Sequence, residues 1–287
     1  HSIMFKFIHL TDTHLVEKGT RLYGLNPHER LSLAIADINQ LHADAHAVFI
    51  TGDLTNWGEP EEYQAFADAL APLTVPLHLL LGNHDIRANF KTAFPDVRCD
   101  ANGFVQSIVE TDQGRMILLD TLQEGTHAGW LCENRLNWLD DQLAEASGVI
   151  YLFMHHPPFD IGISRLDKIG LVQKAEFEAV IAPYNSRIRQ IFFGHVHRPI
   201  NGEWLGIPFS TLYGTNHQVW LNTEFDEKSG MKFCYEQPCY GVVLIDAKKT
   251  LIHTRNYMYR DDVFYSKPKD SNESRRVYAT KAFKPHD

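Results

Sequence analysis

Short apolar runs alternate with segments of helical periodicity along most of the chain. Five runs, IMFKFIHL, HAVFI, LHLLL, VIYLFM and QIFF, are rich in Val, Ile, Leu and Phe and are typical of mostly buried strands. Between them, apolar residues recur at the spacing of an amphipathic helix in segments that begin near residues 26, 59, 133 and 174. This alternation predicts an α/β protein whose sheets are covered by helices.

Two of the predicted helices begin with recognisable capping residues. Asn26 is placed to cap the first helix, Pro27 occupies its first turn, and Glu29 falls at the capping-box position. The second helix opens at Glu59-Pro60 in the same manner. Further along, FVQSIVE and RMILLD are expected to form an antiparallel pair of strands. After residue 205 the chain changes to the β segments PFSTLY, HQVWLNTEF, KFCYE, YGVVLID and LIHTRNYM.

Composition limits the partners of this chain more than its fold. With 287 residues, 44% of them hydrophobic, the chain can build one large domain or a domain with an appendage. The formal net charge of -9 disfavours long nucleic acids, because their affinity depends on neutralising phosphates with Lys and Arg. That charge does not exclude a small anionic ligand.

Targeting and redox signals are sparse. The four cysteines form no CxxC pair and are expected to be free thiols. No apolar stretch reaches the roughly 20 residues needed to span a bilayer, and no signal peptide opens the chain. The opening His1-Ser2 looks like the remnant of an expression tag. We expect a cytoplasmic protein without a membrane partner.

Five polar segments directly follow the five apolar runs. They are Asp12-Thr13-His14, Gly52-Asp53, Gly82-Asn83-His84-Asp85, His155-His156-Pro157-Pro158 and Gly194-His195-Val196-His197. Polar groups placed where buried strands end are typical of an open α/β active site. One such segment would mean little, since Asp-x-His and Gly-Asp are common in turns, but five in this pattern indicate a shared site.

The residue types in these segments suit a pair of metal ions. Residues two apart on an extended chain point to the same side, so Asp12 and His14 are expected to face one ion, and His195 and His197 to repeat that geometry. Gly194 is expected to let the backbone turn sharply where its strand stops. The Asp53 carboxylate can bridge two cations. With the Asn83 amide and the His155 imidazole, this nitrogen and oxygen set suits Zn, Mn, Fe or Co better than Ca or Mg.

The segments DTH, GD, GNHD, HHPP and GHVH, in this order, resemble those of the calcineurin-like binuclear metallophosphoesterases. Within that family the chain is similar to bacterial class III cyclic nucleotide phosphodiesterases and to glycerophosphodiesterases, over about residues 4–220. The resemblance implies a four-layer αββα sandwich of two mixed sheets flanked by helices, with a C-terminal β-rich cap or oligomerisation segment. It also implies metal-dependent hydrolysis of a small phosphodiester by a hydroxide that two metal ions activate.

The resemblance also implies a role for each site residue. It assigns one ion to Asp12, His14, Asp53 and His197, and the other to Asp53, Asn83, His155 and His195, with Asp53 bridging. His84 corresponds to a histidine that contacts the phosphate and protonates the leaving oxygen. Asn83, His84 and His217 are the implied substrate contacts.

Several neighbouring residues allow two interpretations. His156 cannot easily share an ion with His155, because adjacent residues on an extended chain point apart, and we expect it to support the site or to be structural. Asp85 orients a ligand or simply closes its turn. Tyr23 contacts a ligand or packs on the surface. The remaining histidines, His127 among them, are expected to be core or surface residues.

The implied domain plan has three parts. The catalytic domain comprises residues 1–216 with 240–258, the β-rich cap or dimerisation insertion residues 217–239, and a charged C-terminal tail residues 259–287. Members of the family are often dimers or larger, so a homodimer or higher homo-oligomer is expected. Alternative functions are a phosphomonoesterase or phosphonate monoester hydrolase on the same site, a nuclease, which the net charge disfavours, and a non-enzymatic metal-stabilised binding protein.

Overall fold

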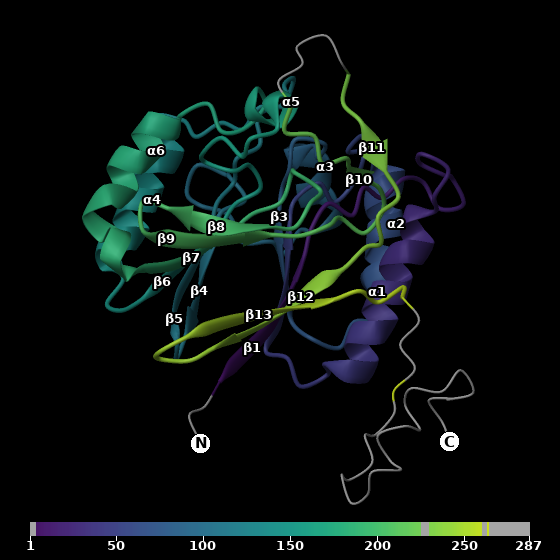
Figure 1. Ribbon diagram of the computed structural model, residues 1–287, viewed down its shortest axis with the longest axis horizontal. Coiled ribbons are helices and arrows are strands. Elements are labelled where there is room, and N and C mark those ends of the chain that lie inside the picture. Colours follow the sequence, from purple (N-terminus) through teal and green to yellow (C-terminus); the bar gives the residue numbers. More distant parts are fainter. Residues whose placement is uncertain (1–3, 225–229, 260–262, 264–287) are drawn as a thin grey trace, which may run out of the picture. The chain divides into compact units, whose positions relative to one another are not determined.

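Two mixed β-sheets lie face to face in the computed structural model, which describes residues 4–224, 230–259 and 263 (Figure 1). The first sheet contains β1 (Phe5–Leu10), β2 (Ala47–Thr51), β3 (Leu77–Leu80), β12 (Tyr240–Ile245) and β13 (Thr250–Arg255). The second contains β4 (Ser107–Thr111), β5 (Gly114–Leu118), β6 (Ile150–Phe153), β7 (Ile188–Phe192), β8 (Ile200–Trp204) and β9 (Ile207–Thr211). Their strand orders are β13-β12-β1-β2-β3 and β4-β5-β6-β7-β9-β8.

Each sheet contains a run of parallel strands. β1 pairs with β2 and β2 with β3 in this way, and so do the neighbours among β5, β6, β7 and β9. Antiparallel strands complete each sheet, with β12 and β13 beside β1, and β4 and β8 at the two edges of the second sheet. The predicted antiparallel pair of FVQSIVE and RMILLD is confirmed as β4 and β5.

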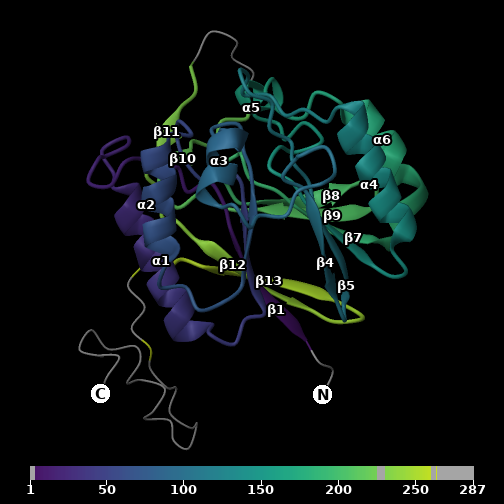
Figure 2. The same cartoon turned by 180° about the vertical axis from the view of Figure 1, so that it is seen from behind.

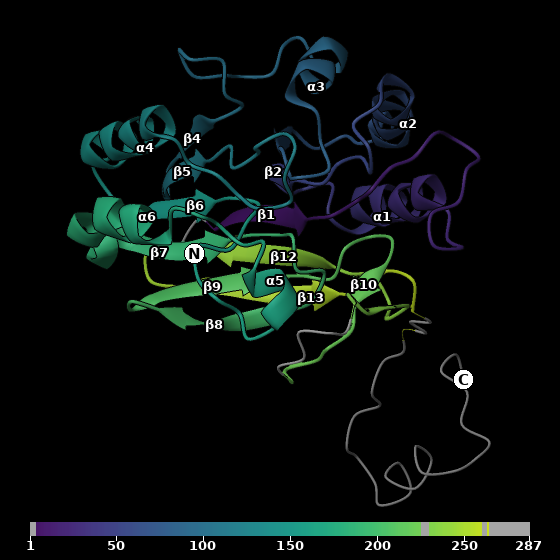
Figure 3. The same ribbon diagram turned by 90° about the horizontal axis from the view of Figure 1, so that it is seen from above.

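Three clusters of buried apolar side chains separate four layers. Phenylalanines fill the space between the sheets, where the ring of Phe49 lies 4.4 Å from that of Phe153. A second cluster joins the first sheet to α1 (Pro27–Leu41), α2 (Pro60–Leu70) and α3 (Arg87–Ala93). A third joins the second sheet to α4 (Glu133–Glu145) and α6 (Lys174–Ile181). The expected αββα sandwich is confirmed, and Figures 2 and 3 show the two groups of helices flanking the sheets.

Local sequence explains where the first helices begin. The Asn26 side chain accepts a hydrogen bond from the main-chain N–H of Glu29 at 3.2 Å, and Pro27 is the first helical residue of α1. In α2, Pro60 again comes first, and the Glu62 carboxylate accepts a bond from the main-chain N–H of Glu59 at 3.2 Å. Both helices start where the sequence predicts.

The segment between residues 217 and 239 forms less β structure than its sequence indicates. Its described strands are β10 (Gln218–Val219) and β11 (Phe233–Cys234), which pair antiparallel. Residues 225–229 lie outside the described part of the chain. The Gln218 side chain bonds both main-chain groups of Gly214, at 2.9 and 2.7 Å, so it stabilises the loop that precedes β10. The long strands expected from HQVWLNTEF and KFCYE are therefore a wrong prediction.

Three short elements were absent from the sequence prediction. They are α3, α5 (Ser164–Asp167) and β8. The helix α3 has one buried side chain, that of Phe90, and β8 has none, so neither gives a clear hydrophobic periodicity. A 3₁₀ segment, Ala182–Arg187, continues the chain after α6.

The contacts along the chain define two units, His1–Tyr257 and Met258–Asp287. Most of the charged tail predicted for residues 259–287 lies outside the described residues. All four cysteines are free thiols, as expected. Among the described helices, none combines the length and the apolar character that crossing a membrane requires.

Candidate metal centre

The five polar segments meet at one end of the two sheets. Each begins within three residues of the last residue of one of the strands β1, β2, β3, β6 and β7. Strands β1, β2 and β3 run parallel, as do β6 and β7, so their carboxyl ends lie together. The side chains that were predicted as ligands are brought into contact there, in two groups that share one carboxylate.

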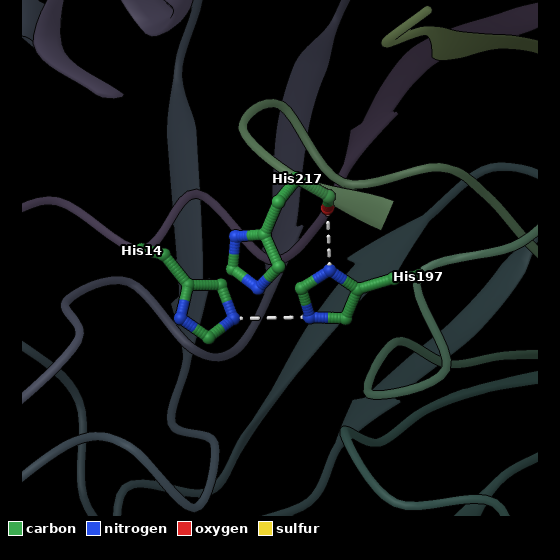
Figure 4. Close-up of side chains that lie close together, drawn as sticks. All are labelled: His14, His197 and His217. Atoms are coloured by element: carbon green, nitrogen blue, oxygen red, sulfur yellow. Dashed lines mark hydrogen bonds between the residues drawn. The ribbon is translucent and has the colours of Figure 1, made fainter. Parts of the chain in front are cut away.

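The first group contains two imidazoles and two carboxylates. The Nε2 atoms of His14 and His197 lie 3.0 Å apart. His197 Nε2 lies 3.2 Å from Asp12 Oδ1, and His14 Nε2 lies 3.4 Å from Asp53 Oδ2. Figure 4 shows the rings of His14 and His197 close together, with the ring of His217 beside them.

The second group contains two further imidazoles and the Asn83 amide. Asn83 Oδ1 lies 3.1 Å from His155 Nε2 and 2.9 Å from His195 Nδ1. His155 Nε2 also lies 3.3 Å from Asp53 Oδ2, the same oxygen that contacts His14. One carboxylate oxygen therefore touches both groups. His195 and His197 belong to different groups, so the expectation that they face one ion together is wrong.

The backbone at these positions is strained. Asp12, His14, Asp53, His195 and His197 have φ values of 53°, 46°, 49°, 71° and 50°, in the left-handed region that few residues other than glycine adopt. Such residues cost about 1–3 kcal/mol each and gather at functional sites. The extended backbone expected for Asp12 and His14 is therefore wrong. The side chains that follow β1, β2 and β7 reach the cluster from left-handed backbone, whereas Asn83 and His155 do not.

Two glycines allow close contact between these segments. A Cβ on Gly194 would lie 2.1 Å from Thr11 Oγ1, and one on Gly82 would lie 2.2 Å from Asp53 Oδ1. Neither glycine has a positive φ. The backbone does turn directly after Gly194, where the main-chain N–H of Val196 donates to the Gly194 carbonyl at 2.8 Å, and the position also requires the absence of a side chain.

Hydrogen bonds to the outer ring nitrogens fix the tautomers of the histidines. The Nδ1–H of His155 donates to the carbonyl of Thr51 at 2.7 Å, and that of His197 donates to the carbonyl of His217 at 2.8 Å. The Nδ1 of His14 lies 2.9 Å from the Asn56 side-chain oxygen. Each arrangement directs Nε2 at the cluster, as in histidines that ligate metals.

The electrostatics of the cluster favour cations. Burial lowers the pKa of His14 and His195 well below the ordinary value, so both are neutral imidazoles. Burial opposes protonation of His155, but Asp53 and Asp12 raise its pKa to about 9. Burial by itself would raise the pKa of the Asp53 carboxyl. The surrounding histidines, of which His155 has the largest effect, outweigh burial and hold that pKa well below its usual range.

The set of atoms fits metal ions. Carboxylate oxygens, an amide oxygen and imidazoles converge in a buried site, and His195 Nε2 is buried without a hydrogen-bond partner among the described residues. Groups of this chemistry bind Zn, Mn, Fe or Co. A cation in the second group would take the place of the proton that the carboxylates otherwise retain on His155.

Two residues with open interpretations support the cluster from outside. The Asp85 carboxylate accepts hydrogen bonds from the main chain of Leu54 and Thr55, both at 3.1 Å, and of Gly82 at 2.9 Å. It thereby ties the loop of Asp53 to the loop of Asn83. His156 lies 2.7 Å from Thr121 Oγ1 through Nδ1 and donates from Nε2 to the carbonyl of His127 at 3.1 Å. Its ring nitrogens bond Thr121 and the loop of His127, although one of them also lies within 4.8 Å of ligand atoms of His155 and His195.

His84 and His217 both lie against the first group. The main-chain N–H of His84 donates to Asp53 Oδ1 at 2.8 Å, and its Nδ1–H donates to the carbonyl of Asn56 at 2.8 Å. The ring of His217 lies 4.9 Å from that of His14 and 4.6 Å from that of Tyr23. His217 also offers a nitrogen to the group formed by His14 and His197.

The cluster opens into a cavity of about 250 Å³. Its apolar wall is formed by Leu166, Ile169, Val219, Met231 and Phe233. A neighbouring cavity of about 660 Å³ shares with it Tyr23, Asn56, Asn83, His84 and His127. Of these, Asn56 and His127 were missed by sequence reasoning. His127 follows no predicted strand and belongs to no motif, so the sequence alone gives it no signal.

A four-layer αββα sandwich with this ligand set at its strand ends defines a metallophosphoesterase. Residues 5–199 match the calcineurin-like phosphoesterase family, and the chain belongs to that family. A protein of Rhodopseudomonas palustris, named a probable cyclic nucleotide phosphodiesterase, is 44% identical over 269 residues, 90% of this chain and 95% of its own. A protein of Arcobacter nitrofigilis, named a probable glycerophosphodiester phosphodiesterase, is 33% identical over 234 residues, 80% of this chain and 85% of its own.

Solved structures agree with the fold. A dimetal phosphatase from Danio rerio superposes with a TM-score of 0.61, at 15% identity, over 88% of this chain and 99% of its own. At that identity the likeness concerns the fold alone.

Proposed function

We propose that this chain hydrolyses small phosphodiesters, cyclic nucleotides or glycerophosphodiesters, with two divalent cations. The observation that carries the proposal is the position of Asp53 Oδ2, which lies 3.4 Å from His14 Nε2 and 3.3 Å from His155 Nε2. A single oxygen in contact with two groups of ligands is what a shared, bridging carboxylate requires. The adjoining cavity of about 250 Å³ gives a small ester room beside it.

The candidate ligands divide between two cation positions. One is held by Asp12, His14, Asp53 and His197, and the other by Asp53, Asn83, His155 and His195. Iron, manganese, zinc or cobalt suits this donor set. When bound, two such cations supply Lewis acidity and a water molecule activated as the nucleophile.

His84 is the proposed proton carrier. Because its Nδ1–H is held by the Asn56 carbonyl, at 2.8 Å, the ring is fixed in orientation and Nε2 remains for the cavity. In its protonated form, Nε2–H donates to a phosphate oxygen or protonates the leaving alkoxide. Asn83 and His217, which also line the cavity, are the other proposed substrate contacts.

Two observations bear on the substrate. The rings of Tyr23 and Phe233 stack 5.0 Å apart and both line the cavity, where they offer a surface to a planar base. The relative at 44% identity is named for cyclic nucleotides, and the relative at 33% for glycerophosphodiesters. We favour a cyclic nucleotide.

Kinetics with the metal-reconstituted protein test the proposal. The panel comprises cyclic AMP, glycerophosphodiesters, a phosphomonoester and a phosphonate monoester, compared by kcat/KM. We expect the highest value with a phosphodiester, and cyclic AMP above the glycerophosphodiesters. A phosphomonoester or phosphonate preferred over every diester would contradict the assignment.

A cytoplasmic location and a homo-oligomer assembled through residues 217–239 complete the proposal. The exposed rings of Trp220 and Tyr235 in that segment support the assembly, because a second subunit would cover them. Sedimentation at micromolar concentration checks it, and a monomer would contradict it.

A further inference from the structure

The Asn83 amide has its two ends in different surroundings. Its oxygen Oδ1 faces the second ligand group, 3.1 Å from His155 Nε2 and 2.9 Å from His195 Nδ1. Its nitrogen Nδ2 lies 2.8 Å from His127 Nδ1. The two ends of an amide have nearly the same size and shape, so packing alone does not choose between them. Hydrogen-bond partners make that choice.

His127 is the partner that distinguishes the two ends. The amide nitrogen of Asn83 can only donate, so His127 Nδ1 accepts, and the proton of the neutral imidazole lies on Nε2. With the proton of His127 on Nε2, a turned-over amide would direct its NH₂ group at the position of a cation and its oxygen at the Nδ1 lone pair. Both contacts would be repulsive.

His127 is itself held in place by the histidine next to a candidate ligand. The Nε2–H of His156 donates to the His127 carbonyl at 3.1 Å, and His156 is fully buried. The loop packs tightly on that ring, because a Cβ on Gly129 would lie 2.5 Å from His156 Cγ. His155 thus contributes to the second cation position as a candidate ligand. His156 contributes indirectly, because it holds the loop that carries His127.

We propose that His127 is a positioning residue that directs the carbonyl oxygen of Asn83 toward the second cation position. The inference rests on the proposed function, since it takes Asn83 as a metal ligand. Hydrogen-bond partners of this kind typically change metal affinity by about 10–100-fold.

Metal titration of the chelator-stripped full-length protein tests the proposal. In His127→Asn, the side-chain oxygen takes the place of Nδ1 as an acceptor, whereas His127→Ala removes the acceptor. The exposed Gln123 lies in the same loop, and Gln123→Ala is the matched control. Cobalt is the probe, since its visible spectrum reports ligand number and geometry, and the melting temperature of each variant checks the fold.

We expect His127→Ala to bind one of two cobalt equivalents about 10–100-fold more weakly, with an altered visible spectrum for that ion. His127→Asn and Gln123→Ala should bind both equivalents as the unchanged chain does. The proposal fails if His127→Ala binds both equivalents normally, if His127→Asn is as weak as His127→Ala, or if both equivalents weaken together with a lower melting temperature. An unchanged chain that binds no second equivalent would instead contradict the proposed function.

Discussion

His84 contacts the candidate centre without belonging to either ligand group. Its main-chain N–H and its Nδ1–H are engaged by Asp53 and Asn56, both at 2.8 Å. We expect His84→Ala to retain its metal and to lose about 10²–10⁴-fold in kcat, the usual effect of removing a general acid or base. Elemental analysis and turnover of one preparation measure both quantities. Undiminished kcat in a metal-replete variant would exclude the proposed role.

Gly194 is a second residue with a measurable role. In Gly194→Ala the new methyl group would meet Thr11 Oγ1 at 2.1 Å and Asp12 Oδ2 at 2.8 Å, so Asp12 must move. We expect weaker metal binding and a lower melting temperature. Gly148→Ala is the matched control, because a Cβ there meets nothing within 4 Å. Equal metal affinity in the two variants would contradict the close-contact explanation.

For single residues, the sequence indicated which side chains form the candidate centre but not the backbone conformation that brings them together. Asp53 and His155 could be predicted because each follows a strand almost directly. The contacts within the cluster depend in part on left-handed backbone at residues such as Asp12, whose φ is 53°. The propensities of aspartate do not predict that conformation. His127 could not be predicted at all, because a loop distant in sequence places it beside Asn83.

Among the elements, the hairpin of β12 and β13 is attached to α1 by a charged contact. Arg255 donates two hydrogen bonds to the Asp37 carboxylate, at 2.9 and 3.0 Å, and Tyr240 donates a third at 2.5 Å. Burial opposes ionisation of Asp37, but Arg255 and Tyr240 outweigh it and hold the pKa below the ordinary 3.8.

This contact predicts a pH-dependent stability. Because the folded-state pKa of Asp37 is lowered, its contribution is present above about 3.8 and is lost as the pH falls through the folded-state value. We expect Asp37→Asn to lower the free energy of unfolding by about 1–3 kcal/mol at pH 7. Urea unfolding of both proteins at pH 7 and pH 3 measures the difference, which should shrink at pH 3. A difference that is equal at both pH values would contradict the ionic explanation.

The short hairpin of β10 and β11 brings Phe233 to the cavity wall. We expect Phe233→Ala to raise KM for a cyclic nucleotide by about 5-fold or more, since stacking on a base is worth roughly 1–3 kcal/mol. Metal content should be unchanged, and KM for a glycerophosphodiester should change little. Michaelis–Menten kinetics on both substrates decide the matter, and equal effects on the two would refute stacking.

The elements that could be predicted are those with a cap or a buried run. Asn26 and Pro27 located α1, and the wholly buried runs of β2 and β6 located those strands. The hairpin of β10 and β11 was overestimated, because its ladder comprises only the pairs Gln218–Cys234 and Val219–Phe233 among the described residues. Hydrophobic patterning indicates a β segment but not how far its partner extends.

In the molecule as a whole, distant segments complete the fold. Phe5 in β1 pairs with Ile245 in β12, so the first sheet includes strands from both ends of the described catalytic unit. Periodicity predicts strands and helices in order but not this pairing, and the layer arrangement was implied by the family resemblance. Long-range pairing depends on the shape of both partners, which a local pattern does not contain.

The candidate centre depends on that assembly. Asp12 follows β1 in the first sheet and His197 follows β7 in the second, yet their side chains lie 3.2 Å apart. A cation that binds here binds only the folded chain, so metal should raise the melting temperature. Metal binding and folding are therefore expected to rise and fall together.

Metal removal and reconstitution, with Asp53→Ala beside the unchanged chain, test the central claim most directly. The unchanged chain, stripped with a chelator and resupplied with manganese or cobalt, should take up two equivalents and recover phosphodiester hydrolysis. Asp53→Ala should bind less metal and lose more than about 100-fold in kcat/KM. That loss exceeds the roughly 10–100-fold effect of removing a residue that only hydrogen-bonds to a metal ligand. The exposed Asp112→Ala is the control and should behave as the unchanged chain. Full turnover by the metal-free chain, or by Asp53→Ala, would contradict a dinuclear centre bridged by Asp53.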